Sequence, residues 1–283
     1  MFMWRPQAAW RTFSALLTGP SLVVRFAAAN GLYSKVRNSW LTLPAPARTS
    51  FSTTLWQTLL QCAASDLAGL KAPDSDRSIK FNIVQRLAMC VARISLSFPN
   101  GIKSVVAQTT ALLTSASPSN AQPLAYLALL ILRAIPEESN ASDFSIRRHR
   151  HVVVESRELL PAIASFVDSA AGADTAPLSL HAVGSQPLLS VAVAAALECL
   201  SAWTEVGMLP GALATSYPRV CALVTTALRS SCHDIVGAAA DCAVRLLHET
   251  SHPPDAARPV FLQQLVTCAL RCIVLCWSCR RGV

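Results

Sequence analysis

Acidic residues and glycines are scarce in this sequence. Of its 283 residues only 16 are Asp or Glu, none of which precedes Asp66, and only 10 are Gly. Ala and Leu dominate instead, and β-branched residues rarely alternate with polar ones as they would in half-buried strands. The composition therefore favours helices over sheets, and the chain is long enough to bury a large core.

The motifs on which common enzyme mechanisms depend are missing as well. The sequence has no glycine-rich phosphate loop, no HExxH zinc motif and no GxSxG nucleophile turn. Carboxylates are sparse, and no pair of them stands out on one helical face in an apolar run. We therefore expect a binding protein and not an enzyme, with no catalytic, cofactor-binding or metal-binding residue. No motif marks an individual partner-binding residue.

Two groups of residues resemble chemical sites but are better explained by packing. Four cysteines share one face of an expected helix near the C-terminus: Cys268, Cys272, Cys276 and Cys279. They would rise by about 16 Å along a straight helix, which is too far for them to meet at one zinc ion. Cys232, His233 and Asp234 are adjacent, so they point in different directions on a helix and do not form a triad by spacing.

The ten cysteines are spread among apolar neighbours, where Cys behaves as a small buried hydrophobe. This usage is typical of a reducing compartment, and no secretory signal is visible. The cytosol or nucleus is therefore the expected location. Six Lys or Arg residues precede Asp66, so the acid-poor N-terminus also imitates a mitochondrial transit peptide. The alternative is that a basic helix pair begins the fold.

Long apolar segments raise the question of a membrane protein. A spanning helix needs about 20 largely apolar residues, and residues 188–203, 124–135 and 262–277 come nearest. The first contains Glu198, the second is too short, and the third contains Arg271. We expect buried core helices, with a polytopic membrane or organellar protein as an alternative.

The net charge of +8 is scattered along the chain. Its one dense cluster is residues 147–151, with the sequence Arg-Arg-His-Arg-His. A short basic run on one helix is usually a solvated face, and no nucleic-acid-binding module surrounds this one. Direct binding of nucleic acid is therefore not expected.

Helical periodicity of the apolar residues, together with Pro and Gly residues that mark helix ends, divides the chain into expected helices. The expected helices are 7–17, 21–38, 44–64, 79–97, 102–113, 123–135, 146–170, 187–206, 213–229, 236–248 and 259–277. Ser21 is placed to cap the second helix. We expect Pro136 to end the sixth and Pro161 to kink or break the seventh. The polar segments 71–78, 115–120, 137–143 and 171–186 read as loops or links.

Helices that begin near residues 21, 79, 123, 187 and 236 each precede a partner helix. Their spacing of about 40 to 65 residues is near the period of HEAT-type repeats with insertions. We therefore predict an all-α fold: an α-solenoid of HEAT-like antiparallel helix pairs in a right-handed superhelical stack. Residues 1–283 would form one such segment of about five to six repeats. The first helix stands alone with exposed Trp4 and Trp10, and the last stays apolar up to Trp277, so we expect truncation at both ends.

Four stretches carry a family resemblance, each described by its residues in chain order. The first is Phe26-Ala27-Ala28 with Leu32, Lys35-Val36, Trp40 and Leu43-Pro44; the second is Ile135-Pro136-Glu137-Glu138; the third is Cys199-Leu200-Ser201-Ala202-Trp203 with Gly207; the fourth is Ala239-Ala240-Asp241-Cys242-Ala243 with Leu246-Leu247. Together they resemble, in order and spacing, the N-terminal part of importin-β-type nuclear transport receptors of the transportin-SR and importin-13 branch. The basic N-terminal helices would then be ordinary repeat helices, which argues against a transit peptide.

The resemblance implies a nuclear import receptor, or a fragment of one, in the nucleus and cytoplasm. Its implied partners are Ran-GTP, cargo proteins such as SR-type splicing factors, and Phe-Gly nucleoporins. The inner helices, which would face Ran and cargo, would be those near 46–64, 102–113 and 146–170. Two departures stand out: family members are usually acidic, whereas this chain is basic, and Gly237 stands where the family tends to carry an acidic residue. The alternative is a helical-repeat scaffold without a transport role.

Overall fold

Helices are the only regular elements in the part of the chain that the structure describes. The computed structural model describes residues 6–68, 74–115, 121–140, 161, 187–206, 218–230, 232–248 and 263. Consecutive helices pack against their neighbours, which confirms the predicted all-α, repeat-like architecture. The chain divides into two compact units, Met1–Arg148 and His149–Val283.

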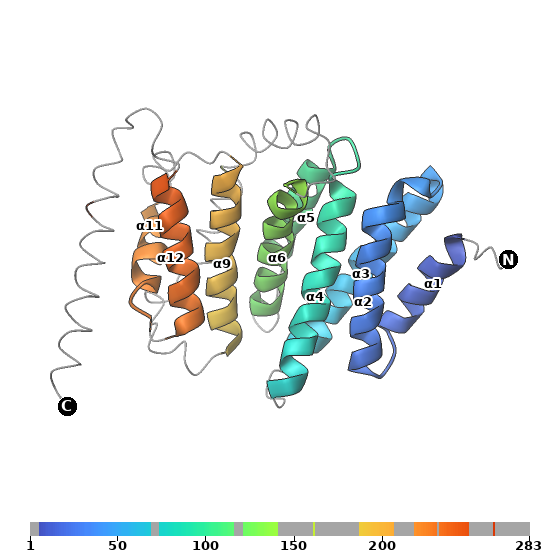
Figure 1. Ribbon diagram of the computed structural model, residues 1–283, viewed down its shortest axis with the longest axis horizontal. Helices are drawn as coiled ribbons and strands as arrows, with labels where there is room; N and C mark the ends of the chain where they lie inside the picture. Colours follow the sequence, from blue (N-terminus) through green and yellow to red (C-terminus); the bar gives the residue numbers. More distant parts are fainter. Residues whose placement is uncertain are drawn as a thin grey trace. The chain divides into compact units, whose positions relative to one another are not determined.

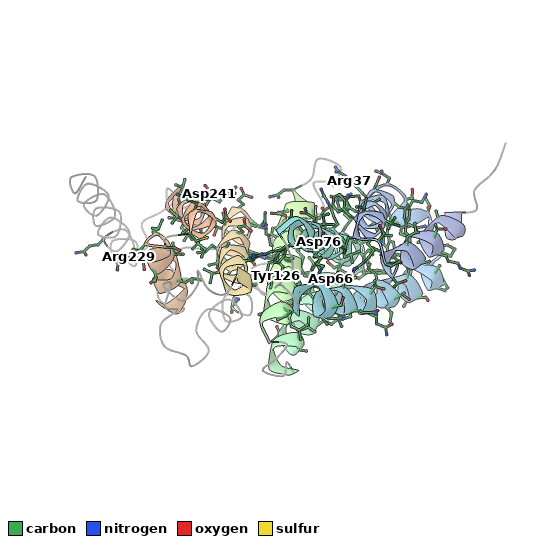
Figure 2. The ribbon with its side chains drawn as sticks, turned by 90° about the horizontal axis from the view of Figure 1, so that it is seen from below. Arg37, Asp66, Asp76, Tyr126, Arg229 and Asp241 are labelled. Atoms are coloured by element: carbon green, nitrogen blue, oxygen red, sulfur yellow. The ribbon has the colours of Figure 1, made fainter. Side chains whose placement is uncertain are left out.

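The first unit contains six described α-helices and a short 3₁₀ helix. They are α1 (Pro6–Leu17), α2 (Leu22–Ser39), η1 (Trp40–Thr42), α3 (Ala45–Ala68), α4 (Asp74–Ser95), α5 (Gly101–Ser115) and α6 (Ala121–Ser139). Helices α2, α4 and α6 lie side by side in one layer (Figure 1). In the second layer α1 packs on α2, while α3 and α5 each pack on α4 and α6. Arg37 on α2 and Asp66 on α3 mark the two layers in Figure 2.

Helix α2 shows how local signals and packing agree. The Ser21 hydroxyl oxygen accepts a hydrogen bond from the Val24 N–H at 3.5 Å, as expected for an N-cap. Ala29, Leu32 and Val36 follow at helical spacing and are almost completely buried. The predicted helix 21–38 is thus confirmed, and so is its apolar face.

The core of the first unit lies between α4 and α6. Ile83 and Leu87 of α4 and Leu127, Ile131 and Ile135 of α6 are all inaccessible to solvent. They recur every four residues, so each helix turns one continuous apolar stripe toward its neighbour. Full burial of each such side chain contributes about 1.5 to 3 kcal/mol, so this stripe contributes substantially to the stability of the unit.

Two predicted helix boundaries were wrong. Helix α4 begins at Asp74 and not at residue 79, because Asp76 suits a first turn, where the helix dipole favours a carboxylate. Helix α6 runs through Pro136 to Ser139, so Pro136 does not end it and residues 137–139 are not a polar link. A proline removes one backbone hydrogen bond. The last turn is nevertheless held by the bond from the Asn140 N–H to the Pro136 carbonyl and by burial of Glu138.

Trp10 is buried, so the prediction that it is exposed was wrong. It is only 3% exposed and its ring meets Phe51 of α3 at 4.8 Å and Trp40 at 5.9 Å between centroids. Trp40 in turn meets Phe98, which follows α4, at 6.1 Å. This aromatic cluster joins α1, η1, α3 and the α4–α5 turn. The first helix is therefore part of the core, while Trp4 lies outside the described residues.

The turn between α4 and α5 requires a glycine. Asn100 has a positive φ of 57°, and a Cβ added at Gly101 would lie 2.0 Å from the Ser95 carbonyl oxygen. This contact is with backbone, so it cannot be relieved by turning a side chain.

Gly101→Ala is expected to lower the free energy of unfolding by about 1 to 3 kcal/mol, the range for a substitution that forces backbone shifts. The matched change is Gly237→Ala in α12 (His233–His248), where an added Cβ meets nothing within 4 Å. That substitution should instead stabilise by about 0.5 to 1 kcal/mol. Denaturant unfolding followed by circular dichroism measures both, and equal effects at the two glycines would contradict the steric argument.

The second unit contains α9 (Pro187–Glu205), α11 (Pro218–Ala227) and α12 among its described residues. Helix α12 packs against both α9 and α11. Leu200 and Trp203 of α9, and Cys242 and Leu246 of α12, are inaccessible to solvent. The predicted helix 187–206 is confirmed, with Ala196, Leu200 and Trp203 buried along it, and α12 begins three residues before the predicted start at 236.

Several predictions fall outside the described residues. They concern the loop 171–186, the helix 259–277 apart from residue 263, and the helix 146–170 apart from Pro161, which is a helical position. Of the described helices, none combines the length and the hydropathy that crossing a membrane requires, including those that contain residues 124–135 and 188–203. The third apolar segment, 262–277, is not described beyond residue 263.

Candidate functional site

Two grooves flank α3 on the layer formed by α1, α3 and α5. The first groove, between α1 and α3, has a volume of about 500 Å³. The second, between α3 and the C-terminal part of α4 with α5, has a volume of about 440 Å³. Helices α3 and α5 occupy the segments that were predicted to be inner helices, 46–64 and 102–113. These grooves are the candidate binding site of the first unit.

The α1–α3 groove has an aromatic wall. Its lining residues are Trp10, Arg11, Ser14, Leu43, Ala47, Ser50, Phe51 and Thr54. Trp10 and Phe51 are in edge-to-face contact, which fixes both rings. Arg11 is exposed at the same groove and is the charged member of its described lining.

The described residues that line the α3–α5 groove carry no charge. Its lining residues are Ser52, Thr53, Leu55, Trp56, Val91, Ile94, Ser95, Phe98, Pro99, Asn100, Gly101, Ser104, Val105 and Gln108. Apolar side chains such as Val91 and Ile94 form its buried part, while Ser104, Gln108 and Thr53 are exposed. An apolar floor with a few polar groups around it is the usual make-up of a binding groove.

Arg48 of α3 lies beside this groove. Its guanidinium carbon lies 6.0 Å from the centroid of Phe98, which lines the groove, in a cation–π arrangement. The buried Arg48 Nε makes no hydrogen bond within the described residues. Arg48 and Arg11 therefore place positive charge on both sides of α3.

Carboxylates are nearly absent from the same layer. The described residues of α1, α3 and α5 include three cations, Arg11, Arg48 and Lys103, and one acid, Asp66. Asp66 is only 4% exposed and is engaged by Arg25 of α2. In contrast, α4 and α6 contain Asp or Glu at four positions: Asp74, Asp76, Glu137 and Glu138. The described helices of the grooved layer thus contain a single carboxylate, and it is buried.

The outward face of α3 is rich in hydroxyl groups. Thr49, Thr53, Thr54 and Thr58 are on this helix, and each donates its hydroxyl hydrogen to the carbonyl oxygen four residues earlier, at 2.9 to 3.3 Å. Such local bonds satisfy the hydroxyl donors without any partner from another helix. They leave α3 with a row of polar, uncharged side chains beside the grooves.

A buried ion pair fixes α3 against the other layer. Arg25 Nη1 and Nη2 donate to the two carboxylate oxygens of Asp66 at 3.1 and 2.5 Å, and Arg25 Nε donates to the Leu17 carbonyl at 2.9 Å. Arg25 Nη2 also lies 3.4 Å from Cys62 Sγ. The hydrogen bond to Asp66 raises the pKa of Arg25, and burial raises the pKa of the Cys62 thiol. One guanidinium therefore joins the end of α1 to α2 and α3.

A second polar cluster joins α2, α4 and α6. The Tyr33 hydroxyl donates to Glu138 Oε1 at 2.6 Å, and Arg93 Nη1 lies 3.7 Å from Glu138 Oε2 and donates to the Glu138 carbonyl at 3.4 Å. Arg86 stacks over the Tyr33 ring. This cluster explains why the last turn of α6 persists beyond Pro136, since Glu138 is tied to both neighbouring helices.

The Tyr33–Glu138 bond predicts a loss of stability in alkali. Burial and the bond to Glu138 raise the pKa of Tyr33 from 10.0 to about 12. Because the folded-state pKa is the higher one, the contribution of Tyr33 is fully present below pH 10 and is lost as the pH rises through about 12. Wild type should be more stable than Tyr33→Phe below pH 10, by about 1 kcal/mol. Urea unfolding of both proteins across this range checks it, and a difference that stays constant with pH would refute it.

The residues that looked like chemical sites in the sequence do not form the site. Cys232 lies just before α12 and its carbonyl accepts from the Val236 N–H, while His233 and Asp234 are exposed in the first turn. The structure groups no three His, Cys, Asp or Glu residues as a metal site within its described ranges. The four cysteines 268–279 and the basic cluster 147–151 lie outside those ranges.

The groove residues were missed because no motif marks them. The one available signal was the run of Ser, Thr and Gln on residues 49–61, which is unusual for an exposed helix face because it lacks charge. Asp66 also carried a signal, as a lone acid in the apolar run 62–67, where an ion pair is expected. Neither pattern shows which residues from other segments of the chain pack beside it.

The four stretches that carry the family resemblance supply the cores of both units. Leu32 and Val36 of α2, Ile135 of α6, Leu200 of α9 and Cys242 of α12 are all buried. These stretches therefore describe how the repeats pack, whereas the residues that line the grooves lie outside them, apart from Leu43. In comparisons with known proteins, no protein-family model matches this chain and no curated protein matches its sequence.

Proposed function

We propose that this chain is a protein-binding helical-repeat segment, and that it serves as the N-terminal part of a nuclear transport receptor of the importin-β type. In that role it would bind cargo proteins and Ran-GTP for import, contact Phe-Gly nucleoporins, and move between nucleus and cytoplasm. The observation that carries the proposal is the pair of grooves beside α3. They lie on the helices that the resemblance assigns to the inner, partner-binding face.

The packing of the repeats supports a binding role. The Arg25–Asp66 pair and the Tyr33–Glu138–Arg93 cluster hold the two layers of the first unit in a fixed arrangement. A rigid stack can present a long preformed surface, which lowers the entropy cost of binding a polypeptide. The described grooves contain no residue set suited to catalysis, whereas their aromatic and polar side chains suit the recognition of a protein chain.

Nucleotide-dependent binding of Ran is the direct test. The purified chain is immobilised and exposed to Ran loaded with a non-hydrolysable GTP analogue or with GDP. We expect the GTP form to be retained at least about tenfold more strongly, a discrimination of about 1.4 kcal/mol. Circular dichroism of the immobilised preparation confirms that it is folded. Equal retention of the two forms by folded protein would contradict the receptor assignment.

A helical-repeat scaffold without a transport role is the second candidate. Its support is the charge of the grooved layer, which has exposed Arg11 and no exposed carboxylate among the described residues of α1, α3 and α5. Receptors of the importin-β type are usually acidic, as suits basic cargo. A scaffold would bind its partner equally well whichever nucleotide Ran carries, so the same experiment separates the two candidates.

A further inference from the structure

We infer that the grooved layer docks an acidic polypeptide segment with apolar side chains, which crosses α3 with its apolar groups in the two grooves and its carboxylates beside Arg11 and Arg48. This inference rests on the proposed protein-binding function but not on a role in transport. It specifies the chemistry of the partner, and it differs from the basic, Arg-rich cargo that the family resemblance implies.

The first support is the position of the two arginines relative to the grooves. Arg11 lines the α1–α3 groove and is exposed. Arg48 is on α3 itself and stacks on Phe98, which lines the α3–α5 groove. Neither guanidinium forms an ion pair with a carboxylate of the described residues, and the buried Arg48 Nε lacks a hydrogen-bond partner there. Each can therefore meet a carboxylate supplied by a bound chain.

The second support is that the described parts of α1, α3 and α5 have no exposed carboxylate that could attract a basic segment. Asp66 is the one carboxylate on the described parts of α1, α3 and α5, and it is buried and bonded to Arg25. A basic segment laid across this surface would meet Arg11 and Arg48 without any compensating carboxylate from these helices. Like charges in an interface disfavour the wrong partner. The surface therefore selects for acidic segments and against basic ones.

The grooves explain why apolar side chains are needed as well. None of the described residues that line the α3–α5 groove is charged, and Trp56, Val91 and Phe98 contribute apolar surface to it. Acidic groups alone would gain little from two partly exposed arginines, because such contacts are weak in water. Apolar side chains that fill the grooves would supply affinity, and the carboxylates would supply selectivity.

The test uses the full chain and three fluorescent peptides of equal length. All three have the same apolar positions, and their remaining positions are Glu, Gln or Lys. Fluorescence anisotropy gives the dissociation constants at physiological and at low ionic strength. We expect the Glu peptide to bind at least about tenfold more tightly than the Lys peptide, with the Gln peptide between them.

Charge variants locate the binding surface. Arg48→Gln and Arg11→Gln should each weaken binding of the Glu peptide by about threefold to tenfold. The matched control is Arg77→Gln in α4, because Arg77 also stacks on an aromatic ring, Phe81, at 5.6 Å. Arg77 precedes the groove residue Val91 by about 20 Å along the helix axis, so its replacement should change binding by less than about twofold. Equal losses in all three variants would mean general attraction to a basic protein and would overturn the proposal.

Variants in the groove provide a second test of where the peptide binds. Ser104→Trp fills the α3–α5 groove from its exposed rim and should weaken binding of the Glu peptide at least about fivefold. Ala107→Trp is the control, because Ala107 is exposed on the same helix but does not line the groove. Tighter binding of the Lys or Gln peptide, or no binding of any peptide, would also overturn the proposal. Retention of Ran-GTP in that event would show that the receptor function stands without it.

Discussion

Asp66→Ala is expected to lower the free energy of unfolding of the first unit by about 3 kcal/mol. The substitution leaves the Arg25 guanidinium, whose side chain is 13% exposed, without the carboxylate that receives two of its hydrogen bonds. A charge left unpaired in a partly buried site costs far more than the pair contributed. Equilibrium denaturation in urea, followed by circular dichroism, measures the change.

The control for this prediction is Glu137→Ala in α6. Glu137 pairs with Arg133 one turn earlier, but both side chains are substantially exposed. Such a pair contributes about 0.3 to 0.5 kcal/mol, so its loss should be small. The double replacement Arg25→Met and Asp66→Leu should recover most of the lost stability, because it removes both charges together. A change below about 1 kcal/mol for Asp66→Ala would contradict the buried-pair interpretation.

Trp203→Ala is expected to destabilise the second unit by about 3 to 5 kcal/mol. Trp203 is inaccessible to solvent and is on α9, which packs against α12. Removing the indole leaves a large cavity that the neighbouring helices can fill only in part. Trp203→Phe keeps an aromatic ring in the same place and should cost about half as much.

Val244→Ala in α12 is the matched surface change, since Val244 is 64% exposed. Its effect should stay within about 0.5 kcal/mol. Thermal and urea unfolding measure the stability of the three variants and place them in order. If Trp203→Ala and Val244→Ala were equally mild, Trp203 would not be a core residue, and the packing of α9 would need revision.

Helices with strong local signals could be predicted from the sequence. The boundaries of α2 and α9 agree with the prediction to within about one residue at each end, because Ser21 caps α2 and an uninterrupted apolar stripe runs through α9. The errors occurred where tertiary contacts outweigh local preference. Pro136 reads as a stop signal, yet contacts of Glu138 with Tyr33 and Arg93 keep the following turn helical.

The candidate site could not be predicted, because its parts are distant in the sequence. Trp10, Phe51 and Phe98 lie on three separate segments, and only the packing of α1, α3 and α5 brings them to the same face. The Arg25–Asp66 pair likewise joins residues 41 positions apart. Periodicity identifies the buried side of each helix but not which helices become neighbours.

The location of the family resemblance has a bearing on function. Its four stretches include buried residues of α2, α6, α9 and α12, as Leu32, Ile135 and Trp203 illustrate. Core residues specify how repeats stack, and many functions share one stacking scheme. We therefore expect the exposed residues beside α3 to decide the partner, which is why the peptide and Ran experiments address different parts of the proposal.

The threonines of α3 determine whether this surface donates or accepts hydrogen bonds. Thr49, Thr53, Thr54 and Thr58 have already given their hydroxyl hydrogens to the backbone of their own helix. What remains available on each is an oxygen with lone pairs, so this row acts as an array of acceptors. A chain lying along α3 would have to turn its amide N–H groups toward the helix, and a segment that presented carbonyl oxygens there would find no donor among these four side chains.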